Sequence, residues 1–109
     1  MAKTAVYCQP GETLDYENKT EEKILANTVI LFGKHIGVAG GDIEPGELGV
    51  LNMVGVFDIP KKSREVLSAG DSVVFTDADG IAKATDTVMG YAVEAAAAEA
   101  TTVKVKLLG

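Results

Sequence analysis

The chain has 109 residues and a formal net charge of −6; it is 47% hydrophobic, 24% charged, and lacks tryptophan. This composition is typical of one soluble globular domain with enough apolar residues for a core. The acidic balance argues against nucleic acid and anionic membrane surfaces as partners, because both would repel the chain.

Cys8 is the single cysteine, so no disulfide can form within the chain and a reducing compartment is expected. The first residues lack the apolar core of a signal peptide, and no apolar run reaches the length of a membrane span. We therefore expect a soluble protein that folds in a cytoplasm.

Turn signals divide the chain into short segments. Pro10-Gly11 and Pro45-Gly46 predict type II turns, in which glycine takes a positive φ, and Gly70-Asp71 marks a third turn. The runs between the turns are apolar and often β-branched, which predicts strands. In chain order these are residues 13–16, 28–32, 35–39, 48–51, 54–59, 72–75, 81–83, 87–93 and 101–107.

The last of these strands has the clearest pattern. Val103, Val105 and Leu107 alternate with Lys104 and Lys106, so one face is expected in the core and the other in solvent.

Two segments do not fit a strand. Residues 61–67 begin with polar side chains and are followed by Gly70, which predicts one or two helical turns. Residues 94–100 are rich in alanine but too short for a stable isolated helix, so we expect a loop between two strands. The predicted fold class is all-β with a minor helical part: a small β-barrel or β-sandwich with one short helix near residues 62–68. Residues 1–12 are expected to form an N-terminal arm and first strand, and residues 13–109 a single β-rich domain.

Candidate residues for chemistry are few. His35, the single histidine, has no second ligand or catalytic partner nearby in sequence, so a structural or surface role is favoured. Cys8 is expected to be buried and inert on the first strand. Asp77 and Asp79 indicate a hairpin turn rather than a calcium loop, because later oxygen ligands are missing. We predict no catalytic residues, no metal and no cofactor. Lys19 as the modified lysine of a lipoyl-type carrier domain is a weak alternative.

From His35 onward, the order of motifs resembles that of the small phage capsid cement proteins. The resemblance rests on IGVA (residues 36–39), PGE (45–47), GVFDIP (55–60), AGDSVVF (69–75), MGYAVEAA (89–96) and VKVKL (103–107). Residues 1–34 match less well, and the role of residues 19–34 stays open.

The resemblance implies a head decoration protein, similar in architecture and role to the lambda-type decoration proteins and of their β-tulip-like type. Such a protein binds the outside of an expanded capsid and links neighbouring major capsid subunits, as a homotrimer at three-fold positions. The implied location is the virion, after synthesis in the cytoplasm of the bacterial host.

Candidate contacts with the capsid or between subunits follow as hypotheses. The N-terminal segment is expected to reach a capsid neighbour by adding a strand or by ordering on binding. Residues 57–60 end a strand, with core favoured over an interface, and the basic cluster after them could contact an acidic surface. The candidates are Ala2, Lys3, Thr4, Val6, Tyr7, Pro10, Phe57, Pro60, Lys61, Lys62 and Arg64. The alternative reading is a small β-rich homo-oligomeric binding module with an unrelated partner.

Overall fold

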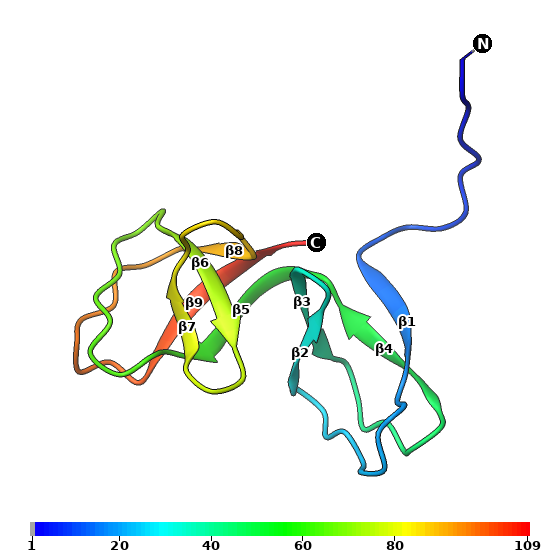
Figure 1. The fold of residues 1–109 in the computed structure, drawn as a ribbon, viewed down its shortest axis with the longest axis horizontal. Helices are drawn as coiled ribbons and strands as arrows, with labels where there is room; N and C mark the ends of the chain where they lie inside the picture. Colours follow the sequence, from blue (N-terminus) through cyan, green and yellow to red (C-terminus); the bar gives the residue numbers. More distant parts are fainter. Residues whose placement is uncertain (1) are drawn as a thin grey trace.

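A computed structural model describes residues 2–109, which form nine β-strands in two antiparallel sheets (Figure 1). The all-β class and the predicted order of nine strands are confirmed. The strands are β1 (Thr13–Glu17), β2 (Val29–Phe32), β3 (His35–Ala39), β4 (Leu48–Asn52), β5 (Val54–Pro60), β6 (Ser72–Thr76), β7 (Gly80–Lys83), β8 (Gly90–Ala92) and β9 (Thr102–Leu108).

The N-terminal sheet has the order β1-β4-β3-β2. Strands β2 and β3 form a hairpin around Gly33, whose φ of 63° suits the tight turn. Strand β4 lies between β1 and β3 and pairs with β1 over its whole length, from Thr13↔Asn52 to Glu17↔Leu48. Two long loops, residues 18–28 and 40–47, meet beyond the sheet at a bridge between Ile24 and Ile43.

The C-terminal sheet has the order β5-β9-β8-β6-β7. Its edge strands approach each other where Lys61 forms a parallel bridge with Ile81 and the Lys62 N–H donates to the Ile81 carbonyl oxygen at 2.8 Å. These two contacts do not extend into a ladder of paired strands between β5 and β7, and the two sheets do not close into a barrel. The expectation of a β-barrel is therefore wrong: β1–β4 form a separate sheet, so the strands never join in one continuous ladder.

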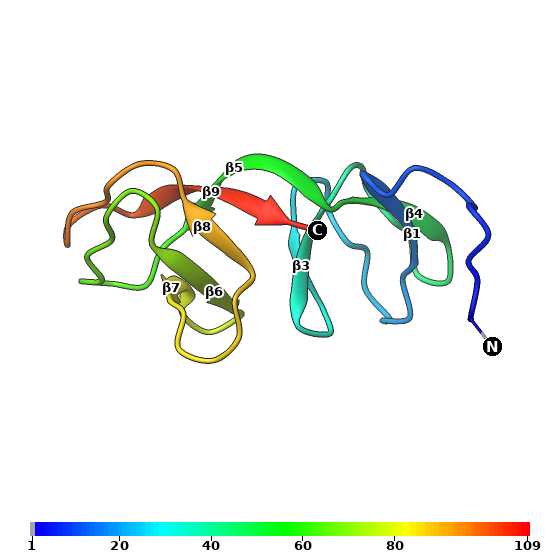
Figure 2. The same ribbon diagram turned by 90° about the horizontal axis from the view of Figure 1, so that it is seen from above.

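The core forms as the alternation of the last strand predicts. Val103, Val105 and Leu107 are buried, and Lys104 and Lys106 are exposed. Ile36 and Val38 of β3 join the buried cluster of the C-terminal sheet, so the hydrophobic effect fixes the two sheets to each other. The bend between them follows Met53, where β4 passes directly into β5 (Figure 2).

No helix forms within residues 2–109, so the helix predicted near residues 62–68 is wrong. Arg64 has a φ of 66°, a left-handed conformation that ends a helical turn. The Lys61 ammonium group donates to the carbonyl oxygens of Lys62 and Glu65, which a helix would use internally. Leu67 then exchanges two backbone hydrogen bonds with Ala96. These long-range contacts override the weak local preference for a helix.

The loop predicted at residues 94–100 is confirmed. Gly46 has the positive φ of 81° that a type II turn requires, whereas Gly11 does not have a positive φ. No helix long and apolar enough to cross a membrane occurs in the part of the chain that the structure describes.

Candidate interaction surfaces

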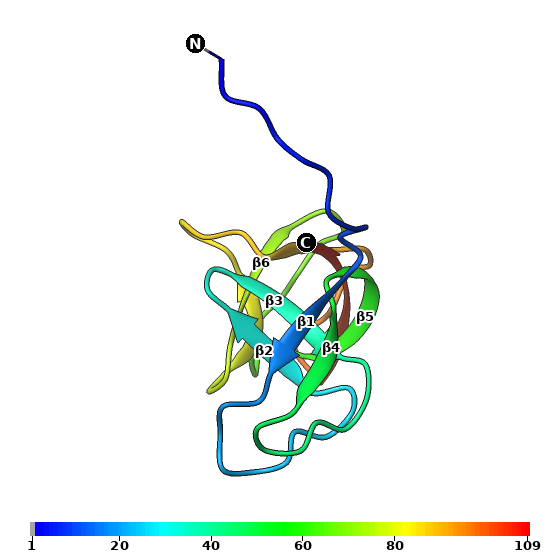
Figure 3. The same ribbon diagram turned by 90° about the vertical axis from the view of Figure 1, so that its right-hand side faces the viewer.

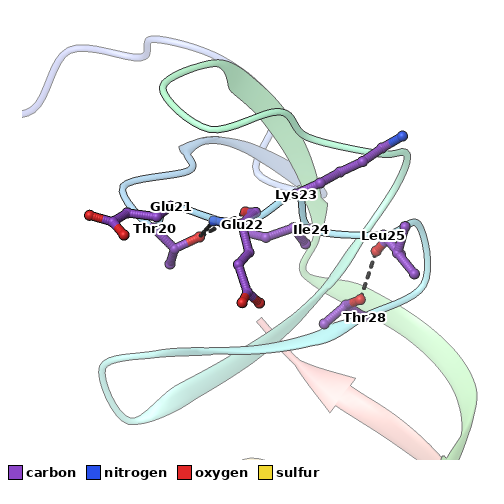
Figure 4. Close-up of a pocket in the computed structure, with 7 residues that line it drawn as sticks. All are labelled: Thr20, Glu21, Glu22, Lys23, Ile24, Leu25 and Thr28. Atoms are coloured by element: carbon purple, nitrogen blue, oxygen red, sulfur yellow. Dashed lines mark hydrogen bonds between the residues drawn. The ribbon is translucent and has the colours of Figure 1, made fainter.

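In the part of the chain that the structure describes, the shallow grooves hold no converging set of reactive groups. The groove formed by residues 20–28 carries Glu21, Glu22 and Lys23, whose side chains point in different directions (Figure 4). His35 is exposed at the start of β3. Within residues 2–109, no three His, Cys, Asp or Glu side chains lie close enough together to hold a metal ion.

The N-terminal arm, residues 2–12, is the most exposed part of the chain. It runs away from both sheets (Figures 1 and 3) and contains no strand. Val6 and Tyr7 are 86% and 81% exposed, which is unusual for large apolar side chains without a partner. Eleven extended residues reach up to about 36–40 Å. The arm therefore offers apolar contacts well beyond the folded body.

The other candidates in the arm share this exposure: Ala2, Lys3, Thr4 and Pro10. Cys8 is also exposed, so its predicted burial on a first strand is wrong. The physical reason is that the first strand begins at Thr13, which leaves Cys8 in the arm without a sheet to cover it.

The candidates after β4 lie in different environments. Phe57 is half-buried against the core and Pro60 is exposed at the end of β5. Lys61 is buried, and its ammonium group is engaged within the turn that follows. Lys62 and Arg64 are exposed on that turn. Of the basic cluster, these two are the side chains that a partner can reach.

Sequence reasoning missed an exposed apolar area on the C-terminal sheet. Val54 pairs with Leu108, and Val56 pairs with Lys106, all on the side of β5 and β9 that points away from the core. We name these four residues the β5–β9 face. Val54, Val56 and Leu108 are 39%, 53% and 50% exposed. The signal was in the sequence, because Leu107 and Leu108 are adjacent in one strand and must point to opposite sides.

Lys106 gives the β5–β9 face its charge. Its Nζ lies 5.8 Å from the centre of the Tyr91 ring, a favourable cation–π distance, and it forms no ion pair among the described residues. The Nζ of neighbouring Lys104, in contrast, lies 3.8 Å from Oε2 of Glu94, and Lys104 pairs with Asp58 across β5 and β9. Asp58 and Lys104 continue the outward side of β5 and β9, so this side carries two lysines and, with Glu94, two carboxylates.

A second apolar area lies on the N-terminal sheet. Leu48 pairs with Glu17 and Val50 pairs with Asp15, and all four are exposed on one side of β1 and β4. We name them the β1–β4 face. Leu48 and Val50 are 70% and 44% exposed, and neither carboxylate forms an ion pair within residues 2–109. This face is apolar with a negative border.

The total surface is also large for the mass of the chain. The described residues expose 7151 Å², whereas a compact monomer of this mass exposes about 5,700 Å². The arm is exposed along its length and the chain measures only 20 Å along its shortest axis, and both features raise the exposed area. A single copy thus leaves roughly a quarter more surface in water than a compact fold would.

The loops of the N-terminal sheet also carry exposed ion pairs. Lys23 Nζ lies 3.4 Å from Asp42 and 3.5 Å from Glu44. The hydrogen bond to Asp42 and the two negative charges raise the pKa of Lys23. A hydrogen bond from the Ala26 backbone N–H, together with Lys23, lowers the pKa of Asp42. Both groups are held in their charged forms.

Two of the three comparisons with known proteins found a match. The model of a family described as phage cement protein matches residues 8–107. The chain is similar to a solved structure, the N base of the head fiber gp8.5 of bacteriophage phi29, at 19% sequence identity and a TM-score of 0.46. That match covers 87% of this chain and 93% of the other. No curated protein sequence matches the chain.

Proposed function

Because the chain belongs to the phage cement protein family, we propose that it binds the outer surface of the expanded capsid and holds neighbouring major capsid subunits together. Family membership gives the chain a structural role in the phage capsid. The match over residues 8–107 is the observation that carries the proposal, since it spans both sheets.

The proposed contacts begin with the N-terminal arm. Its exposed apolar side chains, Val6 and Tyr7, gain most from burial against a partner, and Lys3 adds a positive charge. An extended segment of this length can add a strand to a sheet edge on a neighbouring subunit. Ala2, Thr4 and Pro10 would lie along the same contact. Pro60, Lys62 and Arg64 form a second, smaller contact at the far end of β5.

The finer features of the proposal follow the same reasoning. The copies act as a trimer at three-fold positions of the shell, where lattice symmetry multiplies weak contacts. The protein is made in the cytoplasm of the bacterial host and has no catalytic activity. Stabilisation arises from binding alone, because a ligand that binds only the assembled shell shifts the equilibrium toward it.

Co-sedimentation with expanded capsids stripped of decoration tests the proposal. We expect saturable binding near one copy per major capsid subunit and a rise in the temperature at which the shell opens. Unexpanded shells are the matched control and should bind far less. Absence of saturable binding to a verified expanded shell would refute the cement function and favour a β-rich binding module with another partner.

A further inference from the structure

Each sheet ends in two edge strands, and β2 is the least protected of the four. Charged side chains and prolines are the usual devices that keep an edge strand from pairing with another chain. β1 carries Asp15 and Glu17, and β5 contains Pro60, whereas β2 has neither a charge nor a proline. The edge of β7 is occupied in part, because the Lys62 N–H donates to the Ile81 carbonyl oxygen.

The backbone of β2 is open on one side. The Ala39 N–H donates to the Thr28 carbonyl oxygen at 2.9 Å, and the bonds of an antiparallel pair alternate along each strand. The N–H and carbonyl groups of Val29 and Leu31 therefore point away from β3, toward the open edge. Leu31 and Phe32 are also 37% and 40% exposed, so this edge offers apolar side chains together with free backbone groups.

A groove beside β2 extends this open edge. It has a volume of about 430 Å³, and Phe32 lines it together with Tyr16 of β1 and Leu48 of β4, although β1 and β2 are not paired. The remaining lining residues are polar: Asp15, Glu17, Lys19 and Thr20. A strand added at the edge of β2 would lie next to this groove and could bury side chains against its aromatic and aliphatic groups.

We propose that the open edge of β2 is a strand-acceptor site and that the N-terminal arm of a second copy adds to it as an extended strand. The arm supplies the matching donor: Thr4, Val6 and Tyr7 favour a strand, and residues 2–9 contain no proline. Val6 and Tyr7 are also the two most exposed large apolar side chains among the described residues. Backbone hydrogen bonds supply the affinity of such a contact, and these side chains add burial.

A second copy is favoured over the arm of the same chain. The arm leads directly into β1, and β1 and β2 stand at opposite ends of the strand order. The arm also runs away from both sheets of its own chain (Figures 1 and 3). An exposed strand-forming segment and an unprotected edge on the same chain are complementary only between copies in this arrangement.

The contact belongs to the free protein and does not rest on the proposed function. The arm pairs with one edge at a time, so a capsid edge and the β2 edge of a second copy compete for it. Strand addition depends mainly on backbone groups, which allows one arm to use two acceptors. The free protein would thereby keep Val6 and Tyr7 covered until the shell takes over the arm.

The single cysteine of the chain, Cys8, lies in the arm and permits a direct test. Acceptor variants combine Cys8→Ser with Leu31→Cys or with Phe32→Cys. Because adjacent residues of a strand point to opposite faces, one of the two new thiols lies on the same face as the incoming Cys8. That acceptor, mixed with the unaltered chain in a glutathione redox buffer, should form a disulfide-linked heterodimer.

The matched control acceptor combines Cys8→Ser with Val66→Cys, at a residue 55% exposed outside the N-terminal sheet. Docking raises the local concentration of the two thiols, so the better β2 acceptor should cross-link at least about tenfold faster than this control. Equal rates at all three positions would overturn the acceptor site.

The occupant is tested in one chain that carries both Cys8 and Leu31→Cys, or Phe32→Cys if that position cross-links faster. Disulfides between copies should form, at a rate that rises with protein concentration. A disulfide within one chain, at a rate independent of concentration, would assign the edge to the chain's own arm and overturn the contact between copies.

Backbone pairing also predicts an alternating effect of proline in the arm. The N–H groups of Thr4 and Ala5 point to opposite sides of an extended strand, so one of them faces β2. In sedimentation velocity, either Thr4→Pro or Ala5→Pro should weaken association, and the other should leave it nearly unchanged. Thr4→Ala and Ala5→Ser keep the N–H and are the matched controls. Equal effects of the two prolines would contradict strand addition.

Cross-linking is measured without capsids, so its failure is distinguishable from failure of the proposed function. An arm that shows no preference for β2 in a chain that saturates expanded capsids refutes the acceptor site and leaves the cement function standing. Specific cross-linking in a chain that binds no expanded capsid supports the acceptor site and refutes the cement function.

Discussion

The Asn18 side chain donates a hydrogen bond of 2.9 Å from Nδ2 to the carbonyl oxygen of Ile43, a residue 25 positions away. Asn18 is fully buried, and Nδ2 also donates to the Glu22 carbonyl oxygen at 2.8 Å. Its Oδ1 accepts from the N–H and the hydroxyl of Thr20. The Asn18 side-chain amide thus forms hydrogen bonds with backbone groups of both long loops of the N-terminal sheet.

Asn18→Ala is therefore expected to lower the free energy of unfolding by about 2–3 kcal/mol, because it removes the four hydrogen bonds that this buried amide forms. Denaturant unfolding measures the change. Thr20→Ala is the graded comparison, since Thr20 is exposed and gives up only the hydroxyl bonds; about 0.5–1 kcal/mol is expected. Equal losses from the two variants would contradict the central role of Asn18.

The turn after β5 gives a second prediction. Lys61 is 6% exposed and its ammonium group donates to two backbone carbonyl oxygens, whereas its neighbour Lys62 is exposed. Lys61→Met should destabilise the fold by about 1–3 kcal/mol, because the Glu65 carbonyl oxygen loses its donor and the Lys62 carbonyl oxygen keeps only the Glu65 N–H. Lys62→Met should change stability by less than about 0.5 kcal/mol. Thermal unfolding of the two variants compares them directly; a larger loss for Lys62→Met would show that the turn is held differently.

This turn also shows where sequence reasoning failed. The pattern of residues 61–67 favours a helix locally, and nothing local reveals that Arg64 takes a left-handed conformation or that Leu67 pairs with Ala96. The strands, in contrast, depend on alternation and turn residues, both readable along the chain, as Val103, Val105 and Leu107 illustrate. The division into two sheets depends on β4 pairing with β1, a contact between distant segments. The same limit hid the composition of the two exposed faces: adjacent Leu107 and Leu108 indicate that one leucine points outward, but the residues beside it depend on the cross-strand register.

Packing between β8 and β9 predicts a strict requirement for glycine at position 90. A Cβ there would lie 2.9 Å from Val105 Cγ1 and would press on the backbone carbonyl of Lys106. Gly90→Ala should therefore cost about 1–3 kcal/mol of stability, because a paired strand cannot move aside easily. Gly41→Ala is the control: no atom lies within 4 Å of its Cβ position and its φ is not positive. Equal melting temperatures for the two variants would contradict the close approach.

The Asp42–Lys23 ion pair predicts a pH dependence of stability. The pKa of Asp42 is lowered by folding, so its contribution is complete above the unfolded value of 3.8 and is lost as pH falls through the lower folded pKa. The pKa of Lys23 is raised, so its contribution is complete below 10.5 and is lost as pH rises through the higher folded pKa. Asp42→Asn keeps an acceptor for the Ala26 N–H and removes only the charge.

Melting temperatures of the unaltered chain and of Asp42→Asn should therefore differ near neutral pH and converge below about pH 4. The effect is expected to be small and to shrink with added salt, because both side chains are exposed. A difference that stays constant from neutral pH to pH 2.5 would mean that the charge of Asp42 does not stabilise the loops.

Removal of residues 2–9 separates stability from capsid binding. The side chains of this segment contact neither sheet by a hydrogen bond or ion pair within residues 2–109: the single such bond joins Cys8 Sγ to the Val6 carbonyl oxygen inside the arm itself. The melting temperature should therefore stay nearly unchanged. Affinity for expanded capsids should fall at least about tenfold, because Val6 and Tyr7 are lost as apolar contacts.

A Gly-Ser segment of equal length is the matched control. It keeps the reach of the arm, so loss of binding in this variant assigns the contact to the side chains. Unchanged affinity after deletion would refute the arm as a capsid contact and leave binding to the folded body.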